Sequence, residues 1–522
     1  MKMHSILTGL VAVVMFGIVT DSHGQVPKRV EEPDTVLEER DSGPQHEDHQ
    51  APPEMDPVAT PADYDDDAFR DDPSYPDEPY DAVTETEIYG GKYAVDTPRP
   101  VLELGYPQYL EGPFGAGHDI VGRKNLVRPQ LIVYGDLRTA VAFNDNGADE
   151  VAQVATRLNV DVDLKLTSTE RIHAFFRPLD QGGNFTRHEF GGDDENGTDV
   201  VLDGNLETLF FEGDVGAIQA GLTDEYSSYD LPFAFGLTPM FMQNGNWMDD
   251  AFIGAAASIP ARNSPTLDIS NFDVTAFAGF DKVTTNALKD PNGALADHAG
   301  NIYGLATFMD IQGGYLEAGW GFIDDRRDAD VNNFDYHNLT AAWTRRYGGW
   351  LSNSVRGYAS LGQDPAAGQT QTADGFAILL ENSLITHLPS TLVPYANFFI
   401  GVDRPQPLAR GGDGLLKNTG INFETDGLTG FPKLDDTAQD AWGGAIGVSY
   451  LFNLDQQVVV EIANVEPFGG KSDTIVGSQR ALGARYQIPL TNRLIFRTDA
   501  MVGSRENDDD IAGARAEMRV KF

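Results

Sequence analysis

The stretch Val154-Ala-Thr-Arg-Leu-Asn-Val-Asp-Val-Asp-Leu-Lys-Leu166 alternates between two kinds of side chain. Valine, leucine and threonine occupy one set of alternate positions. Alanine, arginine, asparagine, aspartate and lysine occupy the other. A period of two residues is that of a β-strand, because successive side chains of a strand point to opposite faces. At about 3.3 Å per residue the strand would be roughly 40 Å long, enough to cross a membrane at a tilt.

The same alternation recurs in the C-terminal half of the chain, at residues 394–402 and 494–502. The end of the chain shows it most clearly. The apolar positions Met518 and Val520 and the terminal Phe522 alternate with Glu517, Arg519 and Lys521. The pattern predicts an antiparallel β-sheet that runs to the last residue.

The connections between these segments alternate in length. Short ones are predicted at 168–170, 212–214, 261–266, 312–314, 347–349, 387–390, 453–455 and 489–492. Long polar ones are predicted at 180–198, 281–300, 324–335, 405–440 and 467–477. Tight turns on one side and long loops on the other are typical of an outer-membrane barrel. We therefore predict an all-β transmembrane antiparallel barrel over residues 131–522. Eighteen strands are favoured, and sixteen stay open because 206–211 and 251–259 are weak strands.

Several motifs resemble those of bacterial outer-membrane porins. The final strand with its terminal Phe522 resembles the signal read by the barrel-assembly machinery, with Val520 and Met518 as further parts of it. The run from Tyr134-Gly135 to Phe143 resembles the first porin strand, and 230–239 with 243–249 are loosely similar to phosphate-selective and other substrate-specific porins. The resemblance implies a water-filled channel for small hydrophilic solutes or ions, surrounded by outer-membrane lipid. It also implies a homotrimer by analogy.

The N-terminal quarter has a different composition. Residues 1–24 combine a polar start with a short apolar run and small residues at 22 and 24, which predicts a cleaved signal peptide. Residues 25–130 are predicted to be an acidic, proline-rich disordered linker and lead-in. Residues 31–90 alone hold 21 acidic residues, two arginines and nine prolines. Too little apolar surface is present there to offset the entropy of ordering.

The overall composition excludes several function classes. The chain of 522 residues has 37 Lys and Arg against 80 Asp and Glu, a net charge of −43, and no cysteine. Nucleic acid is not an expected partner, since phosphate binding needs a basic face. Thiol chemistry and disulfides are excluded. No nucleophile-elbow, P-loop, dinucleotide or zinc-protease motif occurs, so we expect no enzyme, no cofactor and no metal site.

Charged residues on the alternate strand face need water, and they are therefore predicted to line a pore. The candidates are Arg138, Arg157, Asp161, Asp163, Lys165, Arg171, Arg177, Arg356, Arg485, Arg497, Arg515 and Arg519. Arginines arranged in a ring around a pore favour anions, while acidic residues at the pore entrance favour cations, so ion selectivity stays open. About half of these arginines are expected to pair with carboxylates in the lumen.

Residues 223–250 form an aromatic-rich connection that is predicted to fold into the lumen as a constriction loop. Its candidate residues are Tyr226, Tyr229, Phe233, Phe235, Phe241 and Trp247. A loop packed on the barrel rim or on a neighbouring subunit is the alternative. For the whole protein, the alternative to a channel is an outer-membrane anchor whose acidic segment binds a periplasmic partner.

Deleting Phe522, or replacing it by a polar residue, is expected to reduce insertion into the outer membrane while secretion to the periplasm continues. The terminal aromatic side chain would be recognised before the last strand is paired. Its loss is therefore expected to impair assembly even where the stability of the folded barrel is unchanged. Fractionation of cells into periplasm and outer membrane measures this. Normal insertion of the deletion variant would mean that the terminal pattern is only an amphipathic strand.

Overall fold

The structure is a computed structural model that describes residues 100–105, 117–193, 196–204, 206–290, 293–328, 333–425, 427–452, 456–470 and 475–522. The predicted signal peptide and the acidic residues 31–90 lie outside these ranges. Their prediction therefore stays as it was made from the sequence.

The alternating segments form long antiparallel strands. In chain order they are β2 (Gln130–Asp145), β3 (Glu150–Lys165), β4 (Arg171–Phe176), β6 (Asn184–Gly192), β7 (Gly197–Asp199), β8 (Leu206–Asp214), β9 (Pro232–Met242), β10 (Met248–Ser264), β11 (Ile269–Asp281), β12 (Gly300–Ile311), β13 (Gly314–Asp325), β14 (Tyr336–Tyr347), β15 (Leu351–Leu361), β16 (Asp374–Leu384), β17 (Leu392–Arg404), β19 (Ala441–Phe452), β20 (Gln456–Pro467), β21 (Gln479–Pro489), β22 (Leu494–Arg505) and β23 (Ile511–Lys521).

Smaller elements accompany the long strands. They are the short strands β1 (Leu102–Gly105), β5 (Asp180–Gln181) and β18 (Ala409–Arg410), and the helix α3 (Val215–Thr223). The side chain of Asp214 caps α3 by accepting a hydrogen bond from the backbone N–H of Ala217 at 2.8 Å. Within the described residues, no helix is long and apolar enough to cross a membrane.

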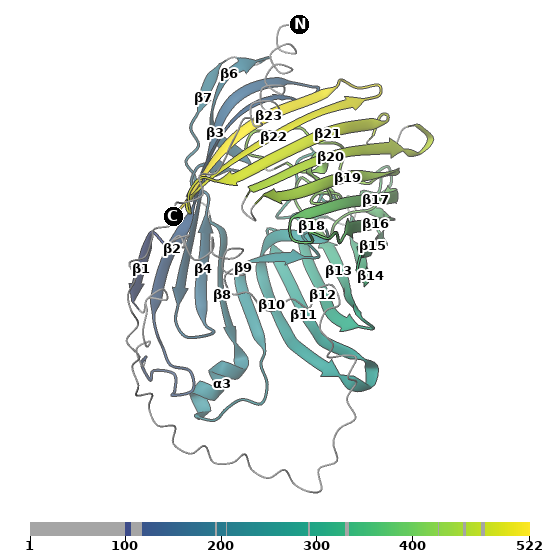
Figure 1. Cartoon of the computed structure of the whole chain (residues 1–522). Helices are drawn as coiled ribbons and strands as arrows, with labels where there is room; N and C mark the ends of the chain where they lie inside the picture. The colour runs from purple at the N-terminus through teal and green to yellow at the C-terminus, as the bar shows by residue number, and fades with distance from the viewer. Residues whose placement is uncertain are drawn as a thin grey trace, which may run out of the picture. The chain divides into compact units, whose positions relative to one another are not determined.

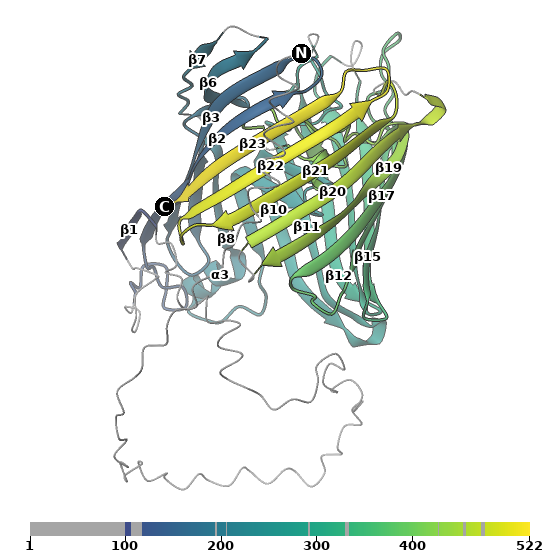
Figure 2. The same ribbon diagram turned by 45° about the horizontal axis from the view of Figure 1, so that its top comes forward.

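The strands close into a ring. From β8 to β23 each long strand pairs with the next long strand in the chain, and β2 pairs with both β3 and β23. Between β3 and β8 the pairing differs, since β4 pairs with β3 and β8, and β6 pairs with β3 and β7. Figures 1 and 2 show β23, in yellow, beside β2, in blue. Of the 23 strands, β1, β5 and β18 stand outside the ring. β4 and β6 pair with the two halves of β3 and together count as one wall strand, and β7 and β8 together form the next one. The wall therefore has 18 strands, the number that the turn pattern favours.

The seam between the first and last wall strands ends on the last residue. The backbone N–H of Phe522 donates to the carbonyl of Gly135 at 3.0 Å, and the N–H of Gly135 donates back at 2.9 Å. A Cβ atom at Gly135 would lie 2.0 Å from the carbonyl oxygen of Asn159, so only glycine fits. Below the seam, β1 pairs with residues 130–133 of β2 and covers the edge that β23 does not reach.

The two faces of the wall differ in polarity. Outward positions carry exposed apolar side chains, such as Leu137, Val141 and Leu339. Inward positions include buried charged groups, such as Arg138 and Glu517. An apolar outer face around a closed, polar-lined barrel is the architecture of a transmembrane β-barrel, as the sequence predicts.

Most of the predicted short turns within the described residues are confirmed, and three connections differ in extent. The segment 212–214 is not a tight turn, because β8 continues to Asp214 and α3 follows. Figure 1 shows α3 at the end of β8 and β9. The segment 180–198 is not a single polar loop, because it contains β5, β6 and most of β7. The segment 261–266 is displaced, because β10 continues to Ser264 and a 3-10 turn at Pro265–Leu267 follows. The predicted turn 453–455 lies outside the described residues. The other short turns lie at the same end of the barrel, called the short-turn end below, and the other end is called the long-loop end.

Candidate functional site: an arginine strip facing an inward-folded loop

The long connection 405–440, between β17 and β19, folds into the barrel. Its apolar side chains Leu408, Leu415, Phe423 and Leu434 are almost fully buried. A loop in solvent would not bury such residues, so their burial inside a barrel stabilises the inward fold. The name "inner loop" is used for residues 405–440 below.

The inner loop fills one side of the lumen. Leu408 and Leu415 pack with inward residues of β10 to β16 and with Leu288 from the connection between β11 and β12. Further along, Leu416, Phe423 and Leu434 pack on the inner faces of β16 to β23. On β21 to β23 this packing involves residues toward the long-loop end, such as Ala481, Met501 and Ile511. Charged side chains occupy the same strands nearer the short-turn end, together with β2 and β3.

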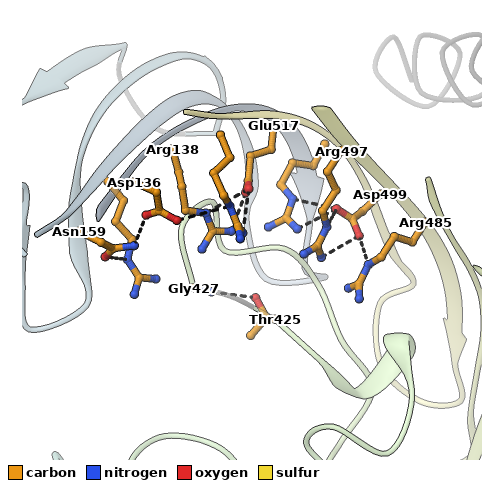
Figure 3. A network of polar contacts seen from close by, with 12 residues as sticks. Asp136, Arg138, Asn159, Thr425, Gly427, Arg485, Arg497, Asp499 and Glu517 are labelled. Carbon is orange, nitrogen blue, oxygen red and sulfur yellow. Dashed lines mark hydrogen bonds and ion pairs between the residues drawn. The ribbon is translucent and has the colours of Figure 1, made fainter. Parts of the chain in front are cut away.

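Six arginines lie together on this part of the wall and are called the arginine strip: Arg138, Arg157, Arg485, Arg497, Arg515 and Arg519. Figure 3 shows three of them, Arg138, Arg485 and Arg497, with the carboxylates Asp136, Asp499 and Glu517, above the segment of the inner loop that contains Thr425 and Gly427. The side chains come from β2, β3, β21, β22 and β23, whose register places them at neighbouring heights.

One half of the strip is organised by Glu517. Arg138 forms a two-pronged contact with this carboxylate, at 3.0 and 2.7 Å, and both groups are buried. Arg519 contacts the same carboxylate at 3.3 Å and Asp136 at 3.6 Å. Asn159 donates to Asp136 at 2.5 Å and accepts from Arg157 at 3.0 Å, which extends the network to β3.

The other half is organised by Asp499. Three guanidinium groups surround this buried carboxylate: Arg485 at 2.8 Å, Arg497 at 2.9 Å and Arg515 at 2.7 Å. Arg485 also reaches Glu424 of the inner loop at 3.1 Å. The strip is therefore held in place from both the wall and the loop.

The tip of the inner loop is anchored on the far side of the strip. Asn144 and Gln153 both donate to the carbonyl oxygen of Thr429, at 2.5 and 2.9 Å. Leu428 packs with Phe185 against the small residues Ala140 and Ala155 of the wall. The loop thus crosses from β17 to β2 and β3 and encloses the strip on its long-loop side.

The base of the inner loop is locked by ion pairs of its own. Asp413 contacts the ammonium groups of Lys417 and Lys433, each at 2.7 Å, and Lys433 also contacts Asp436 at 2.7 Å. Burial acts to raise the pKa of Asp413, but the two ammonium groups outweigh it, so this pKa lies below its usual range. The carboxylate is therefore ionised at neutral pH and holds the loop base.

The other predicted pore-lining residues lie elsewhere on the inner wall. Asp163 contacts His173 at 2.9 Å and Arg171 at 3.4 Å, nearer the short-turn end, with Asp161 beside His173. Lys165 lies at the end of β3. Arg177 pairs with Asp180 and Glu207 beyond β4, and the buried Arg356 contacts Glu317 and Glu381 on β13 and β16. That any of these groups lines a conducting pore is a proposal.

The predicted aromatic constriction loop is not a loop. Residues 232–242 are the wall strand β9, and Phe235 and Phe241 are 51% and 65% exposed on it. Phe233 stacks against Phe235 on the same strand. Tyr226, 83% exposed, and Tyr229 follow α3 at the short-turn end. The many phenylalanines of this segment are explained by a strand whose outer side faces an apolar environment.

Trp247 is the exception among these aromatics. It is fully buried in the turn between β9 and β10, and its indole N–H donates to Asn338 of β14 at 2.7 Å. A Cβ atom at Gly319 would lie 2.5 Å from the indole ring, so this glycine makes room for Trp247. The turn 243–247 folds into the lumen, although the strands on either side do not.

The inner loop was predicted as a polar outer loop, and a signal for its inward fold was present in the sequence. Leucines and phenylalanines recur through residues 408–434, more than a solvated loop needs. Its polar partners, such as Asn144 and Gln153, come from strands more than 250 residues away and carry no local signal.

Comparisons with known proteins add an architectural resemblance. No protein-family model and no curated protein matches the chain. Among solved structures, Pseudomonas aeruginosa OccK2 (OpdF) is 10% identical with a TM-score of 0.49, covering 75% of this chain and 97% of that one. The outer membrane protein OpdK of the same organism is 14% identical with a TM-score of 0.49, covering 75% and 98%. OccK5 (OpdH) is 12% identical with a TM-score of 0.45, covering 75% and 98%.

Replacing Arg138 by alanine is expected to destabilise the barrel by about 3 kcal/mol, because the buried Glu517 then keeps, among its described ion pairs, only the one with Arg519. Urea unfolding in detergent micelles measures this free energy. Arg497→Gln is the matched control, since Asp499 retains Arg485 and Arg515, and a loss below about 1 kcal/mol is expected. Equal losses for the two variants would contradict the roles assigned to the two carboxylates.

Proposed function

We propose that this protein is an outer-membrane porin, a passive channel rather than an enzyme, in which the arginine strip favours small hydrophilic anions. The observation that supports the proposal is the concentration of guanidinium groups on the strip. Six of them lie together on one part of the wall, beside the described carboxylates Asp136, Asp499, Glu517 and Glu424. This local concentration of positive groups occurs in a chain whose net charge is −43.

The location of these guanidinium groups decides their effect. A positive wall inside a narrow, low-dielectric passage raises the local concentration of anions. Acidic groups on exposed loops at the long-loop end, such as Asp508 and Asp509, lie in solvent, where salt screens them over about 8 Å at physiological ionic strength. The strip therefore outweighs the loops in setting selectivity.

The lumen also contains space for solutes on the short-turn side of the strip. A cavity of about 480 Å³ is lined by Asp136, Asp161 and His173, and a larger one of about 1020 Å³ reaches α3 and Lys124. These volumes are of the size that holds small organic molecules. A homotrimer and assembly through the terminal strand remain part of the proposal.

The double variant Arg497→Gln/Arg519→Gln is expected to weaken the anion preference, because it removes two of the six guanidinium groups of the strip. Reversal potentials in planar bilayers under asymmetric KCl measure this preference. The matched control is Arg345→Gln/Arg346→Gln, which removes two equally charged but exposed groups at the end of β14.

Three outcomes are distinguishable in that experiment. A shift toward cations in the strip variant alone supports the proposal. Equal reversal potentials for the strip variant and the control contradict the role of the strip. Bilayers that stay silent with the unmodified protein favour the anchor, the second candidate function, in which the acidic segment binds a periplasmic partner.

A further inference from the structure

The wall has one place where two neighbouring strands pair over only half their length. β8 and β9 pair from Asp214 and Pro232 up to Leu209 and Leu237. Beyond Leu237, residues 238–242 of β9 pair only with β10. On the other side, β7 pairs only with β6, through three residues, and residues 200–204 belong to no strand. The described part of the wall is therefore open between β7 and the far half of β9.

The inward turn 243–247 accounts for this opening. Trp247 is bound to Asn338, and Gln243 accepts a hydrogen bond from Thr340 at 2.8 Å, so the tip of the β9–β10 hairpin is fixed to the inner face of β14. Arg410 of the inner loop donates to the carbonyl oxygen of Gly245 and holds the tip from the other side. In both ribbon views, β6 and β7 diverge from the region of β10 (Figures 1 and 2).

The larger cavity borders the far half of β9. Pro239, Met240, Phe241 and Met242 of that half are among its lining residues. Pro239 also lines the smaller cavity with Asp136, Asp161 and His173, so both lumenal spaces meet at this edge.

The rim of the opening is apolar. Leu202 and Val200 are 78% and 64% exposed in the segment after β7, and Phe241 is 65% exposed on the far half of β9. A free strand edge within a bilayer is costly unless it lines a water-filled cavity, and a proline reduces the number of unpaired N–H groups on such an edge. Pro239 lies on the edge in question.

We propose that the opening between β7 and the far half of β9 is a lateral portal through which small apolar or amphipathic molecules pass between the lumen and the membrane. The apolar rim would accept the apolar part of such a molecule, and the lumen its polar part. The portal rests on the proposed function in one respect, that the lumen is a water-filled channel. It adds a second route, which leaves through the wall rather than along the barrel axis.

Bridging the portal tests the proposal directly, because the native chain has no cysteine. Leu202→Cys/Phe241→Cys, joined by a flexible bismaleimide, closes the opening. Leu339→Cys/Ala359→Cys, joined by the same reagent, bridges register partners in an intact part of the wall and is the control. The two readouts are uptake of the apolar fluorophore N-phenylnaphthylamine by intact cells and ion conductance in planar bilayers.

Bridging the portal is expected to reduce fluorophore uptake to that of cells without the protein, while conductance stays at the unbridged value. The control bridge should change neither quantity. Unchanged uptake after bridging the portal, or a parallel loss of conductance, would overturn the portal. Absence of conductance in the unmodified protein would instead count against the proposed channel.

A second measurement does not depend on forming the bridge. An environment-sensitive label on the Phe241→Cys variant should be quenched both by aqueous iodide and by brominated lipid, because a portal residue meets the lumen and the membrane. The same label on the Leu339→Cys variant should be quenched by brominated lipid alone. Quenching of the label at position 241 by iodide only would place the opening outside the bilayer and would overturn the proposal.

Discussion

The hydrogen bonds of the backbone are the constraint on which the rest of the structure depends. No water is present in the hydrocarbon layer to satisfy an unpaired N–H or C=O, so the sheet must close on itself. Closure occurs where β23 meets β2, and it ends with the mutual hydrogen bonds of Phe522 and Gly135. β1 then covers the short length of β2 that the last strand leaves unpaired.

Closure of the sheet creates a lumen, and the inner loop determines which part of that lumen stays open and polar. An 18-strand ring is too wide for wall side chains to fill. The loop fills one side with leucine and phenylalanine and leaves the arginine strip on the other. Because Glu424 and Thr429 bind the strip and its neighbouring strands, the loop and the charged wall form one unit. A change in either is expected to alter both stability and selectivity.

The sequence predicted the barrel well because alternation is a local signal. The period of two in residues 154–166 and at the C-terminus was sufficient to place β3 and β23 and to assign their faces. It could not predict which connection folds inward, because the partners of the inner loop, such as Gln153, are far away in the chain. Aromatic content was misleading at 232–242, since phenylalanine suits an outward-facing strand as well as a packed loop. Six of the predicted pore-lining arginines lie together in one strip, because the register of adjacent strands places their inward-facing positions side by side.

The central claim is a closed barrel with water on one face of each strand and lipid on the other. Single cysteines placed in turn along residues 156–164 of β3 test it most directly, by their rates of reaction with a membrane-impermeant maleimide. The account predicts fast reaction at 157, 159, 161 and 163 and slow reaction at 156, 158, 160, 162 and 164. Uniform rates along the segment would contradict the barrel, and with it the arginine strip, the channel and the portal.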